Sequence, residues 1–303
     1  MPLSTTFAAA SIKGYGGGTP STYYGNLSSG TLYSSALAHK NATGAQQDGI
    51  YWLNLPTVGV RAVPCLMNDS WNPGGWMMLM KATRGTTFNY NSSHWTTSTT
   101  LNNLWPVTGT GVDGDAKYDT FNVSTISDLM ARWPDVQVLG GSLSYGGCWV
   151  WKQNITGLGY NNALSLFTNG GSYNDLGDGN GKFGGLFVTN ATSYAGYNNA
   201  AAGPTIWSSQ SDINFYGFNF VNYKAYGLNA NCRWGFGWNE NGEGNYSGDP
   251  NLLTTGGAPG SDDVSGGLGM DSNYGSYSAG DCISCCQNRT GYNRSMRVEM
   301  YGR

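Results

Sequence analysis

Glycine is the residue that most restricts what this chain can fold into, because it stands at 47 of 303 positions. The glycines follow no G-X-Y period, which excludes a collagen, and an aromatic content of 14% excludes a disordered chain. No apolar run reaches the ~18–20 residues of a membrane span. The sequence therefore predicts a loop-rich, mostly β globular protein.

Charge is scarce, since only 11% of the residues are charged and the formal net charge is −3. Binding of nucleic acid requires several cations on one face, and the chain has no cluster of Lys or Arg. We therefore expect neither a nucleic-acid partner nor membrane insertion. A surface of low charge density suits recognition of neutral sugars or of another protein. Residues 1–10 lack the basic and apolar segments of a signal peptide.

Histidine and cysteine usage argues against catalysis and against a zinc site. The two histidines, His39 and His94, do not lie near a nucleophile-elbow pattern, and no two acids stand at the defined separation of a glycosidase. A C-x-x-C occurs without the second pair that zinc requires. One or two disulfides involving the C-terminal cluster are expected, with their pairing open. The six cysteines are Cys65, Cys148, Cys232, Cys282, Cys285 and Cys286.

The pattern of apolar residues predicts an α+β fold, rich in β-strands, with long irregular loops. An N-terminal arm over residues 1–47 is expected to precede one domain over residues 48–303. A bulge is expected around Gly217. Strands are predicted over residues 49–53, 58–67, 75–81, 183–188, 213–223, 233–238 and 295–301. Helices are predicted over 33–38, over 126–133 behind a Ser124 cap, and over 161–167.

Several motifs, in this order, resemble the fibrinogen C-terminal-like domain and most of all its intelectin branch. They are Asp48-Gly49-Ile50-Tyr51, Val63-Pro64-Cys65-Leu66-Met67, Pro73-Gly74-Gly75-Trp76-Met77, the acidic segment 113–122, the strand and loop 233–241, Gly267-Leu268-Gly269-Met270 and the terminal segment 297–303. The resemblance covers residues 48–303. It implies a recognition domain that binds exposed glycans or acetylated groups with the help of calcium and performs no catalysis.

Calcium also suits the composition, because Ca²⁺ takes six to eight oxygen ligands and loops rich in Asn, Asp and Gly supply them. Asn239 and Glu240 fall where intelectins place a calcium-ligating amide. The histidine and glutamate ligands that follow the Gly-Met in that family have no counterpart here, and Asp271, Asn273 and Asp281 are the candidate substitutes. The predicted metal ligands are Asp113, Asp115, Asn239, Glu240, Glu243, Asp262 and Asp263. Asp119 and the patch Asp175, Asp178 and Asn180 are further acidic candidates, each with turn capping as the alternative.

Aromatic residues among small polar ones are the candidates for ligand contact. Rigid tyrosines surrounded by Gly, Ser and Asn are typical of recognition surfaces, and the segment after Met270 has this composition. The predicted ligand-binding residues are Trp238, Asp271, Asn273, Tyr274 and Tyr277.

The resemblance extends to fibrinogen-like domains on structural proteins of marine bacteriophages and algal viruses, through residues 281–294 and 1–18. It implies a virion-surface fibre or decoration protein whose arm docks on the capsid or other virion proteins while the domain binds host-surface glycans. Two alternatives stay open: a capsid cement protein that binds no sugar, and a secreted, extracellular lectin. Homo-oligomerisation is open as well, although no heptad repeat predicts a coiled-coil trimer.

Overall fold

The computed structural model describes the sheets and helices that form the core of the protein. The described residues are 23–24, 30–71, 73–82, 85–103, 114–133, 149–170, 173–174, 213–225, 228–239, 263–272, 275–281 and 298–303. They form two β-sheets with three short α-helices, so the expectation of a strand-rich protein holds for this part of the chain. The predicted strand over 183–188 and the cysteine cluster lie outside the described residues.

The first sheet has eight strands, in the order β1-β2-β3-β4-β13-β6-β7, with β5 paired to β4. Only β1 runs parallel to its neighbour; the other pairs are antiparallel. The bounds are β1 Tyr23–Tyr24, β2 Gly49–Leu55, β3 Gly59–Leu66, β4 Trp76–Ala82, β5 Ala116–Lys117, β6 Asp128–Trp133, β7 Trp149–Asn154 and β13 Val298–Gly302.

The centre of the first sheet is buried on both faces. All seven residues of β4 and all five of β13 are buried, which explains why β4 reads in the sequence as a continuous apolar run rather than an alternation. The last strand, β13, inserts between β4 and β6. The sequence predicted β2, β3, β4 and β13 correctly.

The predicted helix over residues 126–133 is wrong. Most of this segment is strand β6, which pairs with β13 on one side and β7 on the other. The spacing of Ile126, Leu129 and Met130 fits one helical face, but a strand covered on both faces also places apolar residues at consecutive positions. Ser124 does not begin a helix; it is the residue that follows the last turn of α2.

The second sheet has five strands in the order β12-β11-β10-β9-β8, all antiparallel. Its bounds are β8 Tyr173–Asn174, β9 Ile213–Ala225, β10 Leu228–Asn239, β11 Asp263–Ser272 and β12 Gly275–Asp281. The bulge expected around Gly217 is not there, because Gly217 pairs in register with Gly235. The irregularities lie on either side, opposite Ala230–Cys232 and Gly237–Trp238.

Of the three short helices in the described residues, two begin at a residue whose side chain caps them. Helix α1 (Ala36–Thr43) is capped by the Ser35 side chain and ends at Gly44 in the left-handed conformation. Helix α2 covers Asp119–Val123. Helix α3 (Ala163–Asn169), close to the predicted one, is capped by Asn162. In the described part of the chain, no helix is both long and apolar enough to cross a bilayer.

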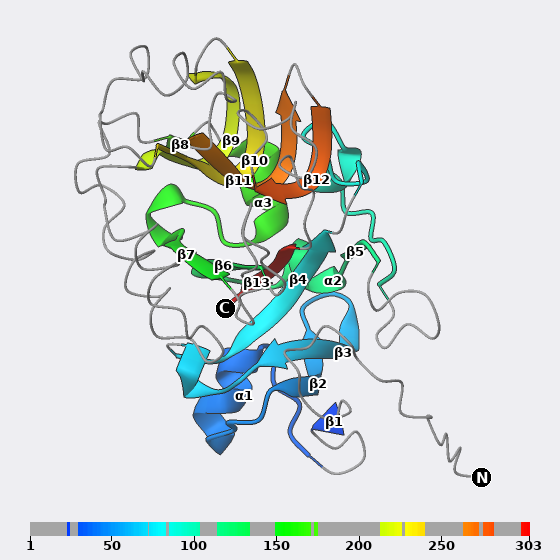
Figure 1. Cartoon of the computed structure of the whole chain (residues 1–303). Helices are drawn as coiled ribbons and strands as arrows, with labels where there is room; N and C mark the ends of the chain where they lie inside the picture. The colour runs from blue at the N-terminus through cyan, green and yellow to red at the C-terminus, as the bar shows by residue number, and fades with distance from the viewer. Residues whose placement is uncertain are drawn as a thin grey trace.

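The folded unit extends N-terminal of residue 48. Ala36 on α1 is fully buried in the core, Lys40 reaches the carbonyl of Met67 at 2.8 Å, and the carbonyl of Tyr33 accepts the N–H of Asn54 on β2. Figure 1 shows α1 beside the end of the first sheet where β2 and β3 lie. Residues 33–47 therefore pack on the sheet, whereas residues 1–22 lie outside the described part.

A chain of aromatic side chains connects the second sheet through α3 to α2, and α2 is attached to β4 of the first sheet by the hydrogen bond from the Thr120 hydroxyl to the carbonyl of Met78. The Trp95 and Phe167 rings lie 4.9 Å apart, Phe167 and Phe218 5.9 Å, and Phe218 and Trp234 5.6 Å, the last pair stacked. Phe121 of α2 stacks on Phe167 of α3, and Figure 1 shows α3 between the sheets. We call Trp95, Phe121, Phe167, Phe218 and Trp234 the aromatic bridge. These residues belong to one continuous core cluster.

We predict that Gly269→Ala destabilises the junction of the sheets more than a matched glycine change elsewhere. Gly269 has φ +63°, and a Cβ there would lie 2.6 Å from Arg233 Cγ and 2.9 Å from Trp95 Cζ2. Gly59 has φ +75° with open space around it, so Gly59→Ala meets only backbone strain of ~1–2 kcal/mol. Gly269→Ala adds overpacking of ~1–3 kcal/mol. Urea unfolding of both variants measures the difference; equal losses would contradict the packing.

Candidate functional site

The predicted metal ligands that the structure describes do not form one group. Asn239 ends β10 and Asp263 begins β11, and the two residues are opposite one another in register. Asp115 precedes β5 of the first sheet. Asp119 is engaged by the Arg61 guanidinium at 2.7 Å. Asp113, Glu240, Glu243 and Asp262 lie outside the described residues.

The predicted ligand-binding residues are divided between two ends of the second sheet. Trp238 lies beside Asn239 at the end of β10, whereas Asp271 and Tyr277 lie where β11 turns into β12. Asp263 and Asp271 are eight positions apart on β11, which corresponds to roughly 26 Å of extended strand. We call the paired end of β11 and β12 that carries Asp271, Ser272, Gly275 and Ser276 the hairpin end. Asn273 and Tyr274, which separate β11 from β12 in the sequence, lie outside the described residues.

At the hairpin end, the Asp271 carboxylate is held by two neutral donors. Its Oδ2 accepts a hydrogen bond from Asn91 Nδ2 at 3.1 Å, and its Oδ1 accepts one from the Ser276 hydroxyl. Asn91 is exposed, and Asp271 and Ser276 are half-buried. Figure 1 shows the segment that follows β4 beside β12. The result is a carboxylate whose two oxygens are oriented by neutral donors.

The loop that carries Asn91 is fixed to the second sheet by two further residues, Ser278 and Arg233. The Ser278 hydroxyl of β12 accepts the N–H of Phe88 at 2.8 Å, and the N–H of Ser278 donates to the carbonyl of Gly85. Arg233 of β10 donates from Nε to the carbonyl of Tyr90 at 2.8 Å and stacks on the Tyr90 ring. The segment that leads to Asn91 is therefore anchored at Gly85, Phe88 and Tyr90, which places Asn91 next to Asp271.

Arg233 also connects the hairpin end to α3. Its NH1 donates to Asn219 Oδ1 at 3.1 Å, and Asn219 Nδ2 donates to the carbonyls of Leu166 and Gly170 at the end of α3. Asn219 has φ +50°, a conformation that asparagine tolerates better than most residues. Burial lowers the pKa of the Arg233 guanidinium, which remains charged because the ordinary pKa of arginine is so high.

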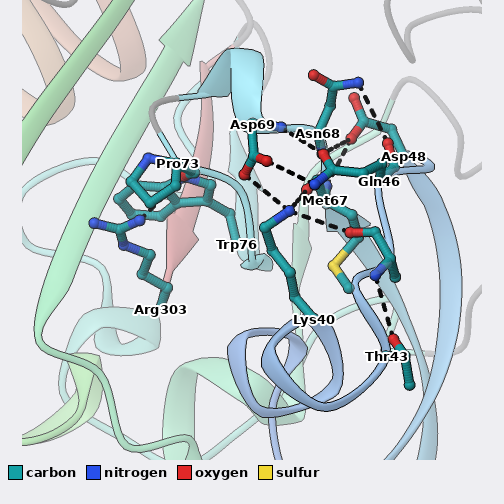
Figure 2. A network of polar contacts seen from close by, with 11 residues as sticks. Lys40, Thr43, Gln46, Asp48, Met67, Asn68, Asp69, Pro73, Trp76 and Arg303 are labelled. Atoms are coloured by element: carbon teal, nitrogen blue, oxygen red, sulfur yellow. Dashed lines mark hydrogen bonds and ion pairs between the residues drawn. The ribbon is translucent and has the colours of Figure 1, made fainter.

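A second polar network surrounds the loop of residues 67–75, between β3 and β4 (Figure 2). Asp48 Oδ1 accepts the backbone N–H groups of Met67 and Asn68 at 2.6 and 2.9 Å. Its Oδ2 accepts the indole N–H of Trp71 at 2.7 Å. One carboxylate therefore accepts hydrogen bonds from three donors of the loop. Asp side chains accept from nearby backbone N–H groups in the same way in turns.

Three cations satisfy carbonyl groups of the same loop. Lys40 donates to Met67 and also pairs with Asp69 at 2.9 Å, as Figure 2 shows. Arg303 NH1 donates to the carbonyl of Pro73 at 3.0 Å and stacks on the Trp76 ring. Lys152 Nζ donates to the carbonyl of Trp71. These contacts satisfy backbone groups of the loop, so the network stabilises its conformation.

Few of these buried charged residues could be identified from the sequence. Lys152 and the ion pair of Arg132 with Glu299, whose atoms lie 2.6 Å apart, are almost completely buried. Burial lowers the pKa of Lys152 to about 7 and that of Lys117 to about 8. Their partners are distant in sequence, so no local pattern identifies them. Only the position of Asp48, at the start of the motif 48–51, was notable from the sequence.

Cys65 and Cys232 are buried thiols in the core. Each donates to a backbone carbonyl, Cys65 to Val63 and Cys232 to Leu268. Burial raises the pKa of both thiols, that of Cys232 to about 12, so both are protonated at neutral pH. Neither is a reactive nucleophile.

Comparison with known proteins leaves the hairpin end to be interpreted from its own geometry. No protein-family model matches the chain, and no curated protein matches its sequence. Within the described residues, no three His, Cys, Asp or Glu side chains gather as a metal site would require.

Replacing Asp48 by asparagine tests the network around residues 67–75. An amide in this place has one acceptor oxygen, so Asp48→Asn sets an NH₂ group against the Trp71 indole N–H or the two backbone donors. We expect a loss of ~1–3 kcal/mol in the free energy of unfolding. A double-mutant cycle with Trp71→Phe, measured by urea unfolding, isolates the indole contact. Additive losses would show that Asp48 and Trp71 act independently.

The pKa of Lys152 predicts a rise in stability with pH. The folded protein releases this proton near pH 7, whereas the unfolded chain keeps it until about pH 10.4. Between these values the unfolded state binds more protons, so the free energy of unfolding rises by up to ~1.4 kcal/mol per pH unit. Urea unfolding at pH 7, 8 and 9 should show that the free energy of unfolding rises less with pH in Lys152→Met than in the wild type. Lys117 is common to both proteins, so its contribution cancels; parallel curves would refute the assignment.

Proposed function

We propose that this chain is a virion-surface structural protein whose intelectin-like domain binds host-surface glycans without catalysis. The sequence motifs of the fibrinogen-like family support the domain, and the charge-poor composition supports a neutral ligand. Residues 1–22, rich in Ser, Thr, Gly and Ala, are proposed to dock on capsid or other virion proteins.

The observation that carries this proposal is the oriented Asp271 carboxylate at the hairpin end. Carbohydrate recognition relies on side chains that accept from and donate to hydroxyl groups, and a carboxylate, an amide and a hydroxyl meet here through Asp271, Asn91 and Ser276. These groups are held in place before any ligand arrives, so binding orders few side chains.

Calcium is proposed at the other end of the second sheet, where Asn239 and Asp263 are opposite one another in register. Two residues with oxygen-bearing side chains agree with a hard cation, and Glu240 and Glu243, which follow Asn239 in the chain, are the next candidates. A bound calcium ion would neutralise negative charge there and cross-link the end of β10 to the start of β11.

A glycan array, read with and without a calcium chelator, tests the proposed function. We expect retention of the purified protein on a subset of neutral glycans. If the protein bound no glycan on the array, the result would support the alternative of a capsid cement protein. Mass spectrometry and negative-stain imaging of purified particles test the location separately: finding the protein absent from virions would refute the virion-surface assignment and favour a secreted lectin.

A further inference from the structure

We propose that Asp271 accepts hydrogen bonds directly from two adjacent hydroxyl groups of a neutral sugar, with no cation between the carboxylate and the ligand. This inference rests on the proposed function and names the ligand class and the contact. Its basis is the orientation of the carboxylate, its distance from the other acidic candidates and the rigidity of the loop beside it.

The two protein donors leave acceptor capacity on the Asp271 carboxylate. An ionised carboxylate offers about four lone-pair sites, and Asn91 Nδ2 and the Ser276 hydroxyl occupy one on each oxygen. Asp271 is half-buried rather than enclosed. Each oxygen can therefore accept a further hydrogen bond from a ligand, and two neighbouring hydroxyl groups match the two oxygens.

A cation that bridges Asp271 to the sugar would need more ligands than its described surroundings offer. Ca²⁺ requires six to eight oxygens. The nearest candidate pair of described residues on the sheet, Asn239 with Asp263, stands roughly 26 Å along the strand from Asp271. Asn91 presents its NH₂ group to the carboxylate, which is the orientation of a donor to an anion and not of a metal ligand.

The loop beside Asp271 is already ordered. Arg233 holds the carbonyl of Tyr90, and Ser278 holds Gly85 and Phe88. Pre-organised contacts strengthen binding because less freedom is lost when the ligand arrives. The negative charge of Asp271 disfavours acidic sugars, so the ligand is a neutral sugar with vicinal hydroxyl groups.

Replacing Asp271 by asparagine, and separately Asn91 by alanine, tests this contact on the full chain. The probe is the neutral glycan with the strongest array signal, measured by calorimetry with calcium and with chelator. We expect at least tenfold weaker binding for Asp271→Asn, a smaller loss for Asn91→Ala, and no effect of the chelator on the wild type. Asn54→Ala, at an exposed asparagine of β2, is the matched control and should bind as the wild type does.

The outcomes separate this inference from the proposed function. If the chelator abolishes glycan binding, or if binding is unchanged in Asp271→Asn, the direct contact is refuted. The proposal that the protein binds glycans stands in either case. Absence of binding by the wild type overturns both. Urea unfolding of each variant establishes that it is folded. If Asp271→Asn is not folded, the binding of Asn91→Ala and the chelator series decide whether the direct contact exists.

Discussion

The structure depends on the aromatic bridge that joins its two sheets. Trp95, Phe167, Phe218 and Trp234 follow one another within ring-contact distance, and such pairs contribute ~0.5–1.5 kcal/mol each beyond burial of their area. The indole N–H of Trp234 also donates to Gln153 of β7 at 3.0 Å, a direct hydrogen bond from one sheet to the other. Because Trp95 belongs to the loop that carries Asn91, the same packing sets that loop against the hairpin end.

Charge is scarce in the chain, yet several charged groups of the described residues are placed inside the fold. Asp48, Lys40 and Arg303 each satisfy backbone groups of residues 67–75. A loop that contributes buried N–H and C=O groups must find partners for them, and ionised partners make the stronger hydrogen bonds.

The sequence predicted six of the thirteen described strands, namely β2, β3, β4, β9, β10 and β13, because their apolar runs are short and bounded by turn residues. It failed over residues 126–133, where Leu129 and Met130 fit both a helix and a buried strand, and only pairing with β13, far along the chain, decides between them. It named Asp271, and the structure adds Asn91, 180 positions away. Contacts of this range leave no local pattern, so neither Asn91 nor Lys152 could be found from the sequence.

The central claim is that the two sheets form one cooperative unit through the aromatic bridge. Native-state hydrogen exchange as a function of denaturant measures this most directly. The account predicts that the slowest amides of β4 in the first sheet and of β10 in the second open with the same free energy and the same denaturant dependence. A distinctly lower opening free energy for β10 would contradict it, because the second sheet would then unfold while the first stays intact.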